Sequence, residues 1–239
     1  MRSLLFVPGH NERLMESAKR SDADVIILDL EDSVPDKDRD KARELVREFV
    51  CDKPVYVRIK SAFDLAYVND SHTIMVPKSH TNRLRYYDNL GYNKLIALIE
   101  TAQGVLEAAE ICKLPNVVAV AFGGEDFKAD LQGTDTHTAR SIIAMAARAA
   151  GITPIDSVHT KVNDLDDLEK SLRVSKSLGY GGMLCLHPKE IPLVHKWFTP
   201  SKEEIERAEK IVKYEGQGVV VVDGEIIGPP MIRAAKKLL

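Results

Sequence analysis

Two acidic residues that follow apolar segments are the clearest sign of chemistry in this 239-residue sequence. Glu100 directly follows Lys94–Ile99, and Asp126 closes the segment that begins with Val117–Phe122. If both segments are neighbouring strands of a parallel sheet, they lie about 4.8 Å apart, and the two carboxylates can converge on one ion. Hard oxygen ligands at a site open to water suit Mg²⁺. We therefore predict a Mg²⁺ site, with simple helix capping by these acids as the alternative.

A second acidic group, made of Asp29, Glu31 and Asp32, lies at the end of another apolar segment. Arg58 lies inside the apolar segment Val55–Ile59, where an unpaired guanidinium would be costly. Its planar fork matches a carboxylate, so Arg58 could hold an acidic substrate or stabilise an enolate oxygen. It could also form a salt bridge to Asp29 or Glu31, and the two roles are compatible. For Asp32, a site role and a capping role are equally supported.

Other groups near the ends of apolar segments allow further roles. The Gly123-Gly124 pair leaves main-chain N–H groups unshielded, and these could bind a substrate carboxylate. His187 could act as an acid or base, although a single histidine at a strand end more often has a structural role. A Schiff base at Lys78 or Lys161 is another option, but the clustered acids favour metal chemistry. The sequence contains no Walker loop and no Cys/His cluster with metal-binding spacing.

Eight short segments rich in Val, Ile and Leu could position these residues. They are near-continuous and not alternating, as is typical of parallel strands that are covered on both faces. The predicted strands are Ser3–Val7, Val25–Leu30, Val55–Ile59, Thr73–Val76, Lys94–Ile99, Val117–Phe122, Thr153–Asp156 and Gly182–Leu186.

Amphipathic stretches between these segments indicate helices. The predicted helices are Glu12–Ser21, Lys37–Val50, Thr101–Cys112, Thr138–Ala150 and Leu165–Leu178. The gap from Lys60 to His72 is short, so a helix there has one turn or is absent. Eight repeats of strand and helix predict a single (β/α)₈ TIM barrel, with a doubly wound sheet as the alternative. In such a barrel the catalytic residues lie at the C-terminal ends of the strands, where the acids are found.

The last part of the chain changes character. We predict that residues 1–200 form the barrel and that residues 201–239 form a C-terminal helix–hairpin–helix extension. Asp223-Gly224 lies between two apolar triplets and indicates a hairpin turn, and Pro229 opens the last helix. We interpret this extension as a lid or an oligomer contact.

Composition excludes several classes of protein. The net charge is −3 and charged residues make up 29%, which argues against a nucleic-acid-binding protein. No apolar run is long enough to span a membrane, and the N-terminal apolar run is shorter than that of a signal peptide. The three cysteines are far apart and odd in number, as expected for reduced thiols. We therefore expect a cytoplasmic protein.

Several segments, taken in order, carry a resemblance to a known family. They are RSLLFVPGHNERLMESA, ADVIILDLEDSVPDKDRDKAR, VYVRIK, IMVPK, LIALIET, VAFGGEDFKADL and GGMLCLHPKEI. Together they resemble the citrate lyase β-subunit-like proteins, which are CoA-ester carbon–carbon lyases of the HpcH/HpaI aldolase superfamily. The resemblance covers nearly the whole chain.

This resemblance implies a TIM barrel with Mg²⁺ held by Glu100 and Asp126. It implies substrate contacts from Arg58, Gly123, Gly124 and Glu125, and catalytic roles for Arg58, Glu31 and Asp32 near the metal. It further implies a homo-oligomer, a trimer or a hexamer, whose C-terminal segment closes over a neighbour's site. The implied substrates are a 2-oxo acid and an acyl-CoA or carrier-bound thioester, as in citryl-, malyl- or citramalyl-CoA cleavage.

The chain also departs from the resemblance. The stretches after Lys60 and after Asp130 are shorter than usual. Gly228 stands where relatives with lyase-type activity often carry an aspartate that acts as acid or base. We expect a Mg²⁺-dependent carbon–carbon lyase, and two alternatives stay open. One is a 2-oxo-acid aldolase that uses no CoA, and the other is a non-catalytic subunit that binds a 2-oxo acid.

Overall fold

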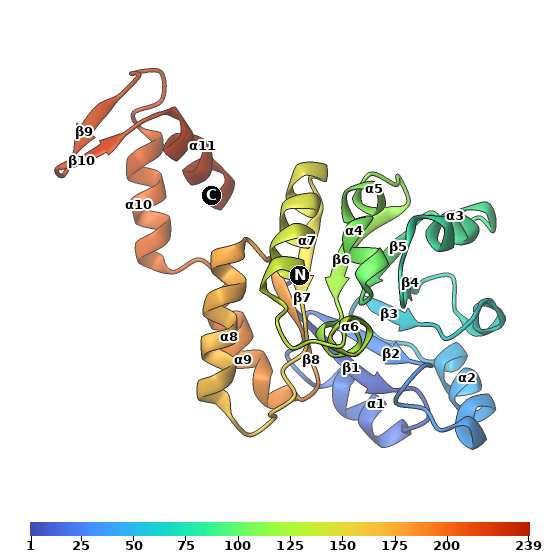
Figure 1. Ribbon diagram of the computed structural model, residues 1–239. Helices are drawn as coiled ribbons and strands as arrows, with labels where there is room; N and C mark the ends of the chain where they lie inside the picture. Colours follow the sequence, from blue (N-terminus) through green and yellow to red (C-terminus); the bar gives the residue numbers. More distant parts are fainter. The chain divides into compact units, whose positions relative to one another are not determined.

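Eight parallel strands close into a barrel in the computed structural model, which describes residues 1–239 (Figure 1). Each strand pairs with the next one along the chain, and β8 pairs with β1. The strands are β1 Ser3–Pro8, β2 Val25–Asp29, β3 Val55–Arg58, β4 Thr73–Val76, β5 Leu95–Ile99, β6 Val117–Phe122, β7 Thr153–Asp156 and β8 Gly182–Cys185. The predicted TIM barrel is therefore confirmed, and a doubly wound sheet is excluded.

Helices alternate with the strands and surround the barrel (Figure 1). They are α1 Glu12–Lys19, α2 Arg39–Glu48, α3 Thr81–Asn89, α4 Ala102–Leu106, α5 Ala108–Cys112, α6 Gly124–Leu131, α7 His137–Ala150, α8 Leu165–Leu178 and α9 Ile191–Phe198. Short 3₁₀ helices cover Asp36–Asp38, Ala62–Tyr67 and Pro188–Glu190. The helix predicted for 101–112 is divided at Glu107, and α3 and α6 were not predicted.

Alternate strand residues belong to two different cores, and this explains why the strands are apolar throughout. Ile27 of β2 and Ile96 of β5 belong to a cluster inside the barrel. Ile26 and Leu28, the chain neighbours of Ile27, belong to the larger cluster between the strands and the helices. Because side chains alternate along a strand, every strand of a covered barrel needs apolar residues at successive positions.

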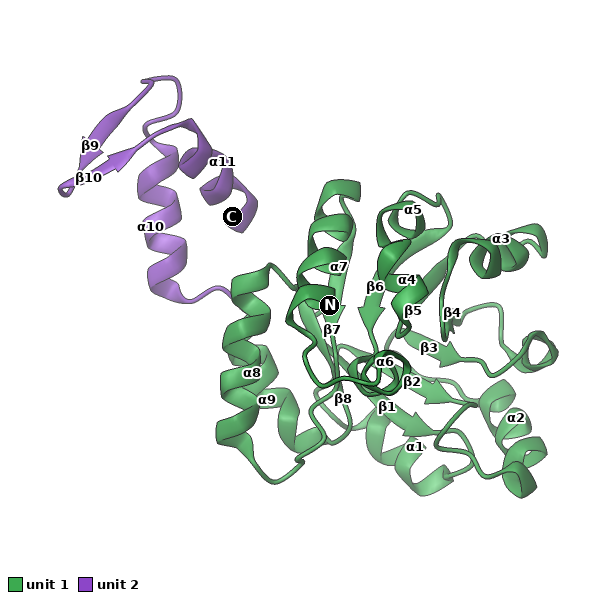
Figure 2. Ribbon diagram, in the orientation of Figure 1, with its two compact units in different colours: residues 1–198 green, residues 199–239 purple.

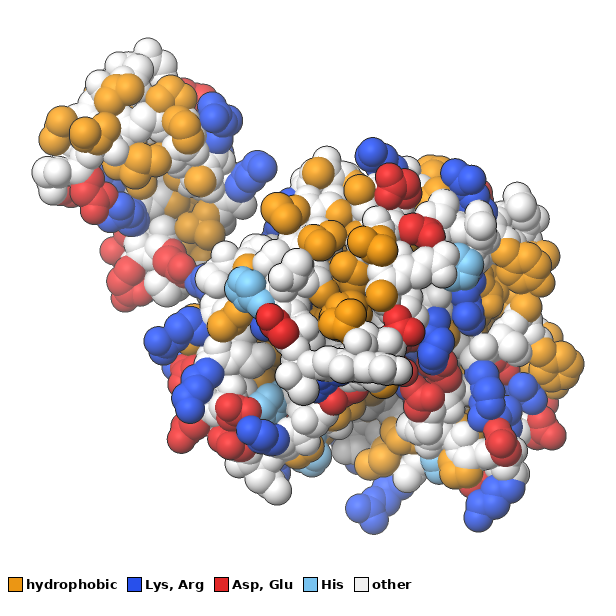
Figure 3. Space-filling model, viewed as in Figure 1, with side chains coloured by type: hydrophobic (Ala, Val, Ile, Leu, Met, Phe, Trp, Pro, Cys, Tyr) orange, Lys and Arg blue, Asp and Glu red, His pale blue; other side chains and the backbone are white.

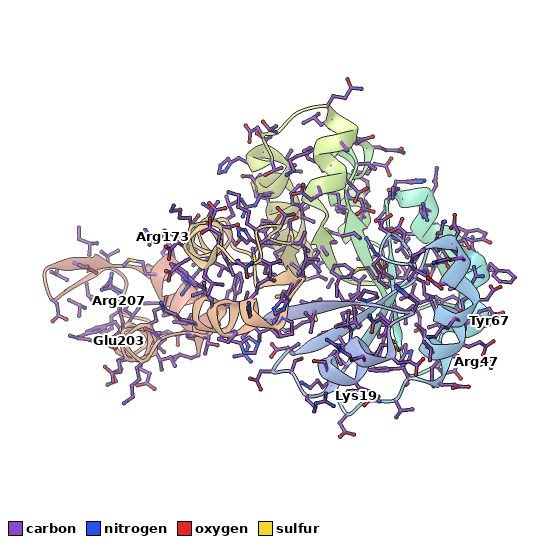
Figure 4. All side chains as sticks on the ribbon, turned by 90° about the horizontal axis from the view of Figure 1, so that it is seen from below. Lys19, Arg47, Tyr67, Arg173, Glu203 and Arg207 are labelled. Carbon is purple, nitrogen blue, oxygen red and sulfur yellow. The ribbon has the colours of Figure 1, made fainter.

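The short 3₁₀ helix Ala62–Tyr67 occupies the place of the third barrel helix and is anchored to α2. Buried Asp64 accepts hydrogen bonds from the N–H groups of Lys60 and Ser61 and from the guanidinium of Arg43. Arg47 of α2 lies beside the ring of Tyr67, 5.9 Å from its centroid (Figure 4). No α-helix forms in this gap, as one of the two predicted options allowed, but the six-residue 3₁₀ helix is about two turns long and not one.

Residues 199–239 form a separate compact unit (Figure 2). It consists of α10 Lys202–Val212, the antiparallel hairpin of β9 Val220–Val222 and β10 Glu225–Ile227, and α11 Pro229–Leu238. Asp223 and Gly224 both have positive φ, 51° and 82°, as a tight hairpin turn requires. Ile211, Ile227 and Ile232 lie in its small core. The chain divides after Phe198, two residues before the predicted boundary.

The surface of the barrel unit carries apolar side chains between α4 and α7 (Figure 3). Leu106 of α4 is 81% exposed and Met145 of α7 is 64% exposed. Exposed apolar side chains that gather on one face often mark a contact surface. No helix of this structure is both long and apolar enough to cross a membrane.

Candidate active site

The alternation of side chains brings three predicted site residues into the mouth of the barrel. Glu100 follows β5 two residues after Leu98, which lies in the interior cluster. Asp29 lies two residues after the interior Ile27, and Arg58 lies two residues after Tyr56, which packs against the same cluster. Since side chains two residues apart lie on one face of a strand, these charged groups continue the interior rows at the C-terminal ends of the strands.

Arg58 is paired with the acidic residues that follow β2. Its Nε lies 2.7 Å from Asp29 Oδ1 and its Nη2 lies 2.8 Å from Asp29 Oδ2, which makes a bidentate pair. Its Nη1 lies 3.3 Å from Glu31 Oε2 and 3.3 Å from Asp32 Oδ2. Burial alone would lower the pKa of the guanidinium, but the hydrogen bonds to Asp29 and the charges of the three acids together outweigh burial and hold that pKa above its usual value.

Glu100 is almost fully buried, with 1% of its surface exposed. Its Oε1 accepts a 2.7 Å hydrogen bond from the main-chain N–H of Lys78, which follows β4. A methyl group at Gly123 would lie 2.5 Å from Glu100 Oε2, so only glycine leaves room for the carboxylate here. Burial, and then the charge of Asp126, raise the pKa of Glu100 to about 8. A cation beside it would relieve this cost.

Three carboxylates converge on the ammonium group of Lys78. Its Nζ lies 3.0 Å from Glu31 Oε1, 3.8 Å from Asp126 Oδ1 and 4.0 Å from Glu100 Oε1. Burial would lower the pKa of this ammonium, but the hydrogen bond to Glu31 and the charges of the three carboxylates together outweigh burial and raise that pKa. The side chains of Glu100 and Asp126 therefore reach one point in space, and a cationic group already lies there.

The position of Asp126 differs from the prediction in one respect. It does not end a strand, because β6 ends at Phe122 and α6 begins at Gly124. Asp126 lies in the first turn of this helix, and its side chain is 40% exposed. A carboxylate at a helix N-terminus interacts favourably with the helix dipole, so the capping alternative is also satisfied.

The two glycine N–H groups are not free, contrary to the prediction. The N–H of Gly123 donates to the carbonyl of Ile99 at 2.9 Å and extends the pairing of β5 with β6. The N–H of Gly124 donates to Ser157 Oγ at 2.9 Å. A cavity of about 110 Å³ lies next to this turn and is lined by Gly124, Glu125 and Ser157 among others.

A divalent cation fits this mouth. Five carboxylates face two cationic side chains, the acids being Asp29, Glu31, Asp32, Glu100 and Asp126 and the cations Arg58 and Lys78. The buried Oε2 of Glu31 has no hydrogen-bond partner. No group of three or more His, Cys, Asp or Glu side chains is arranged so that it could hold a metal ion. An ion held by Glu100 and Asp126 would therefore keep positions for water or substrate oxygens, as Mg²⁺ does.

Two other candidate residues, His187 and Lys161, make contacts that differ from their proposed catalytic roles. Nδ1 of His187 accepts a hydrogen bond from the N–H of Lys189 and caps the 3₁₀ helix that follows β8. Lys161 lies exposed and pairs with Asp167 at 3.1 Å. These contacts support the structural role for His187 and give no support to a Schiff base at Lys161.

One buried polar cluster at the strand ends was missed. Asp156, the last residue of β7, accepts hydrogen bonds from Arg140 of α7 and Ser175 of α8. Its neighbour Ser157 is the residue that binds the Gly124 N–H. A carboxylate that closes an apolar strand was the same signal that singled out Glu100, and it could have identified Asp156.

A closed (β/α)₈ barrel with acidic residues converging at the C-terminal mouth defines a TIM-barrel protein with its site at the strand ends. The model of the HpcH/HpaI aldolase/citrate lyase family matches residues 2–188, and the chain belongs to this family. The family resemblance noted in the sequence is thereby confirmed.

Several known proteins are similar to this chain over nearly its full length. A citrate lyase subunit beta-like protein of Deinococcus radiodurans is 30% identical over 274 residues, which cover 100% of this chain and 96% of that protein. A (3S)-malyl-CoA thioesterase of Cereibacter sphaeroides is 32% identical over 265 residues, which cover 100% and 93%. The solved structure of protein CitE from Mycobacterium tuberculosis with magnesium, acetoacetate and coenzyme A is similar with a TM-score of 0.85 and 30% identity, covering 99% of this chain and 96% of that one.

Proposed function

We propose that this protein is a Mg²⁺-dependent carbon–carbon lyase that acts on the thioester of a 2-hydroxy or 2-oxo acid, of the citryl-, malyl- or citramalyl-CoA type. The observation that carries the proposal is the convergence of Glu31, Glu100 and Asp126 on one cation position beside Arg58. The similar structure of CitE, described as a complex with magnesium, acetoacetate and coenzyme A, supports the same ligands for this chain.

Glu100 and Asp126 would hold the Mg²⁺ ion. When bound, the ion supplies a Lewis acid that polarises a substrate carbonyl oxygen. The position of Glu100 suits this role because the Lys78 N–H donates a hydrogen bond to one of its oxygens and Gly123 leaves room for the other. Asp126 is more exposed and completes the pair from the first turn of α6.

Arg58 would bind the substrate oxygen on which negative charge develops. Asp29 engages Nε and Nη2, so the guanidinium cannot rotate freely. Nη1 makes only the longer 3.3 Å contacts with Glu31 and Asp32, and it is the nitrogen most available to a substrate oxygen. A fixed donor aimed at developing charge lowers the barrier because it needs no reorganisation during the reaction.

Glu31 and Asp32 are the proposed proton carriers. Burial raises the pKa of Glu31, only partly offset by Arg58 and Lys78, so this carboxyl can hold a proton at higher pH than an exposed glutamate. Its buried Oε2 makes no hydrogen bond and lies 3.3 Å from Arg58 Nη1, so it stands beside the proposed substrate-binding nitrogen. Asp32 is 59% exposed and could exchange that proton with solvent.

The turn at the start of α6 would receive the carboxylate of the acid. Gly124 and Glu125 begin this helix and line the adjacent cavity. Helix N-termini bind anions through their free N–H groups and their dipole. Because Gly123 and Gly124 already donate elsewhere, the contact would come from Glu125 and the next main-chain group, or from Gly124 after it leaves Ser157.

We further propose a homo-oligomer, formed through the apolar side chains between α4 and α7. The C-terminal unit would then act as the lid over a neighbour's mouth. Light scattering of the purified protein tests the oligomer, and Leu106→Glu with Met145→Glu should shift it to smaller species. An unchanged mass in this double variant would count against this surface.

Turnover of purified protein on a panel of citryl-, malyl- and citramalyl-CoA, with and without Mg²⁺, tests the function. Glu100→Ala or Asp126→Ala should abolish metal-dependent turnover, while Glu16→Ala on exposed α1 should not. Full activity in either site variant would refute the proposal. The same panel with free acids identifies an aldolase that uses no CoA. The absence of an acid at Gly228 favours a non-catalytic binding subunit as second candidate, which would bind 2-oxo acids without turnover.

A further inference from the structure

Lys78 has an unusual backbone conformation for a lysine. Its φ is +47°, in the left-handed region that costs a residue with a side chain about 1 kcal/mol or more. This conformation follows Pro77 at the end of β4 and directs the main-chain N–H of Lys78 to Glu100. The strained residue is therefore the one whose main-chain N–H binds Glu100, the proposed metal ligand.

The side chain of Lys78 lies close to Glu100 as well, and to two further carboxylates. Although 43% of the side chain is exposed, its ammonium lies 3.0 Å from Glu31 and within 4.0 Å of both Glu100 and Asp126. A surface lysine gains little from one exposed partner. Three acidic partners, from the segments that follow β2, β5 and β6, make this ammonium the counter-charge of the acidic cluster.

Lys78 and a divalent cation cannot share this position. An ion bound by Glu100 and Asp126 would lie next to the Lys78 ammonium, and like charges a few ångströms apart repel each other. The flexible four-carbon stem of lysine and its partial exposure allow the side chain to turn outward. The main-chain bond to Glu100 does not depend on where the side chain lies.

We propose that Lys78 is a built-in cation that occupies the site until a divalent metal displaces its ammonium, and that this displacement sets the metal affinity. This inference rests on the proposed metal site. In the metal-free protein the ammonium limits repulsion among Glu31, Glu100 and Asp126. Metal binding must break its contacts, so the measured affinity is weaker than the carboxylates alone would give.

Substitutions at Lys78 separate this role from a purely structural one. Lys78→Met removes the competing charge and keeps an unbranched side chain, so Mg²⁺ should bind roughly threefold to tenfold more tightly. Lys78→Arg keeps a cation and should show no such gain. Lys60→Met is the matched control, because Lys60 is also a half-exposed lysine near the mouth but pairs only with exposed Asp36. Isothermal titration with MgCl₂ measures all four affinities.

The unmodified protein offers a second readout that involves no variant. Brief acetylation with acetic anhydride, followed by mass spectrometry, reports how accessible each lysine is. Saturating Mg²⁺ should increase the labelling of Lys78 several-fold and leave that of Lys60 unchanged.

The outcomes distinguish the inference from the proposed function. If neither the wild type nor Lys78→Met binds Mg²⁺, both the metal site and the inference are wrong. If the wild type binds Mg²⁺ but Lys78 labelling does not rise and Lys78→Met binds no more tightly, only the inference is overturned. Increased labelling together with tighter binding by Lys78→Met supports it.

Discussion

Asp29 and Arg58 are direct partners in the register of β2 and β3, and their side chains meet in a bidentate pair. The strand pairing that closes the barrel thus also positions the guanidinium. Asp29 accepts two further hydrogen bonds, from the N–H groups of Glu31 and Ser33, which fix the acidic turn after β2. One buried carboxylate therefore orders both the arginine and its neighbouring acids.

Asp29→Asn tests this relationship. The substitution keeps the shape of the side chain but leaves the buried charge of Arg58 without its main partner, so the free energy of unfolding should fall by about 3 kcal/mol. Urea denaturation at neutral pH measures the loss. Asp36→Asn removes an exposed carboxylate that pairs with Arg39, and it should change stability far less. Equal effects of the two substitutions would contradict the structural role of the Asp29 pair.

Gly123→Ala should weaken metal binding without unfolding the barrel. The added methyl group would lie 2.5 Å from Glu100 Oε2 and 2.6 Å from Glu100 Cβ, so the carboxylate must move. Displaced ligands typically reduce metal affinity by about 10-fold to 100-fold. Titration with MgCl₂ checks this, with circular dichroism to confirm the fold. Gly133→Ala is the control, because its methyl group would meet nothing closer than 3.6 Å. Wild-type Mg²⁺ affinity in Gly123→Ala would show that Glu100 is not a ligand.

The sequence predicted the barrel and much of its mouth because two simple periodicities control them. Near-continuous apolar strands indicate burial on both faces, and the position of Glu100 directly after β5 places it on the interior row of Leu98. The Arg58–Asp29 pair was among the predicted options for the same reason. These features depend on strand order and side-chain alternation, which local sequence encodes.

Features that depend on the chain between elements were not predictable. Asp126 was predicted at a strand end because nothing in Gly123-Gly124 indicates that α6 begins there. Glycine favours neither a strand nor a helix. The position of the Lys78 ammonium depends on a left-handed backbone at a non-glycine residue, which no local pattern indicates. The occupied N–H of Gly124 depends on Ser157, 33 residues further along the chain.

Glu190→Gln should remove a pH dependence of stability. Glu190 is buried, its Oε1 has no hydrogen-bond partner, and burial raises its pKa to about 7. Between the unfolded pKa of about 4.3 and pH 7 the unfolded chain loses a proton that the folded protein keeps. The free energy of unfolding therefore decreases as pH rises through this window, and the loss is complete above it.

The Gln variant cannot ionise, so it should be about as stable as the wild type at pH 4 and more stable by roughly 3 kcal/mol at pH 8. Urea denaturation across this range measures the difference. Glu110→Gln, at an exposed position of α5, should give a difference that does not change with pH. A constant difference for Glu190→Gln as well would show that this carboxyl is ionised in the folded protein.

Gly228→Asp tests whether the missing acid limits catalysis. Gly228 has extended backbone angles and precedes α11, and an added Cβ would meet only Val219 at 3.7 Å and Pro230 at 3.8 Å, so a side chain fits without strain. An aspartate there would also cap the helix, and stability should not fall. If relatives use this carboxylate as acid or base, turnover on the preferred thioester should rise at least about tenfold.

Gly228→Asn is the matched control, since it caps equally well but carries no acid. A rise with Asp but not with Asn would identify proton transfer as the limiting step, whereas equal rates in both variants and the wild type would leave that task with Glu31 and Asp32.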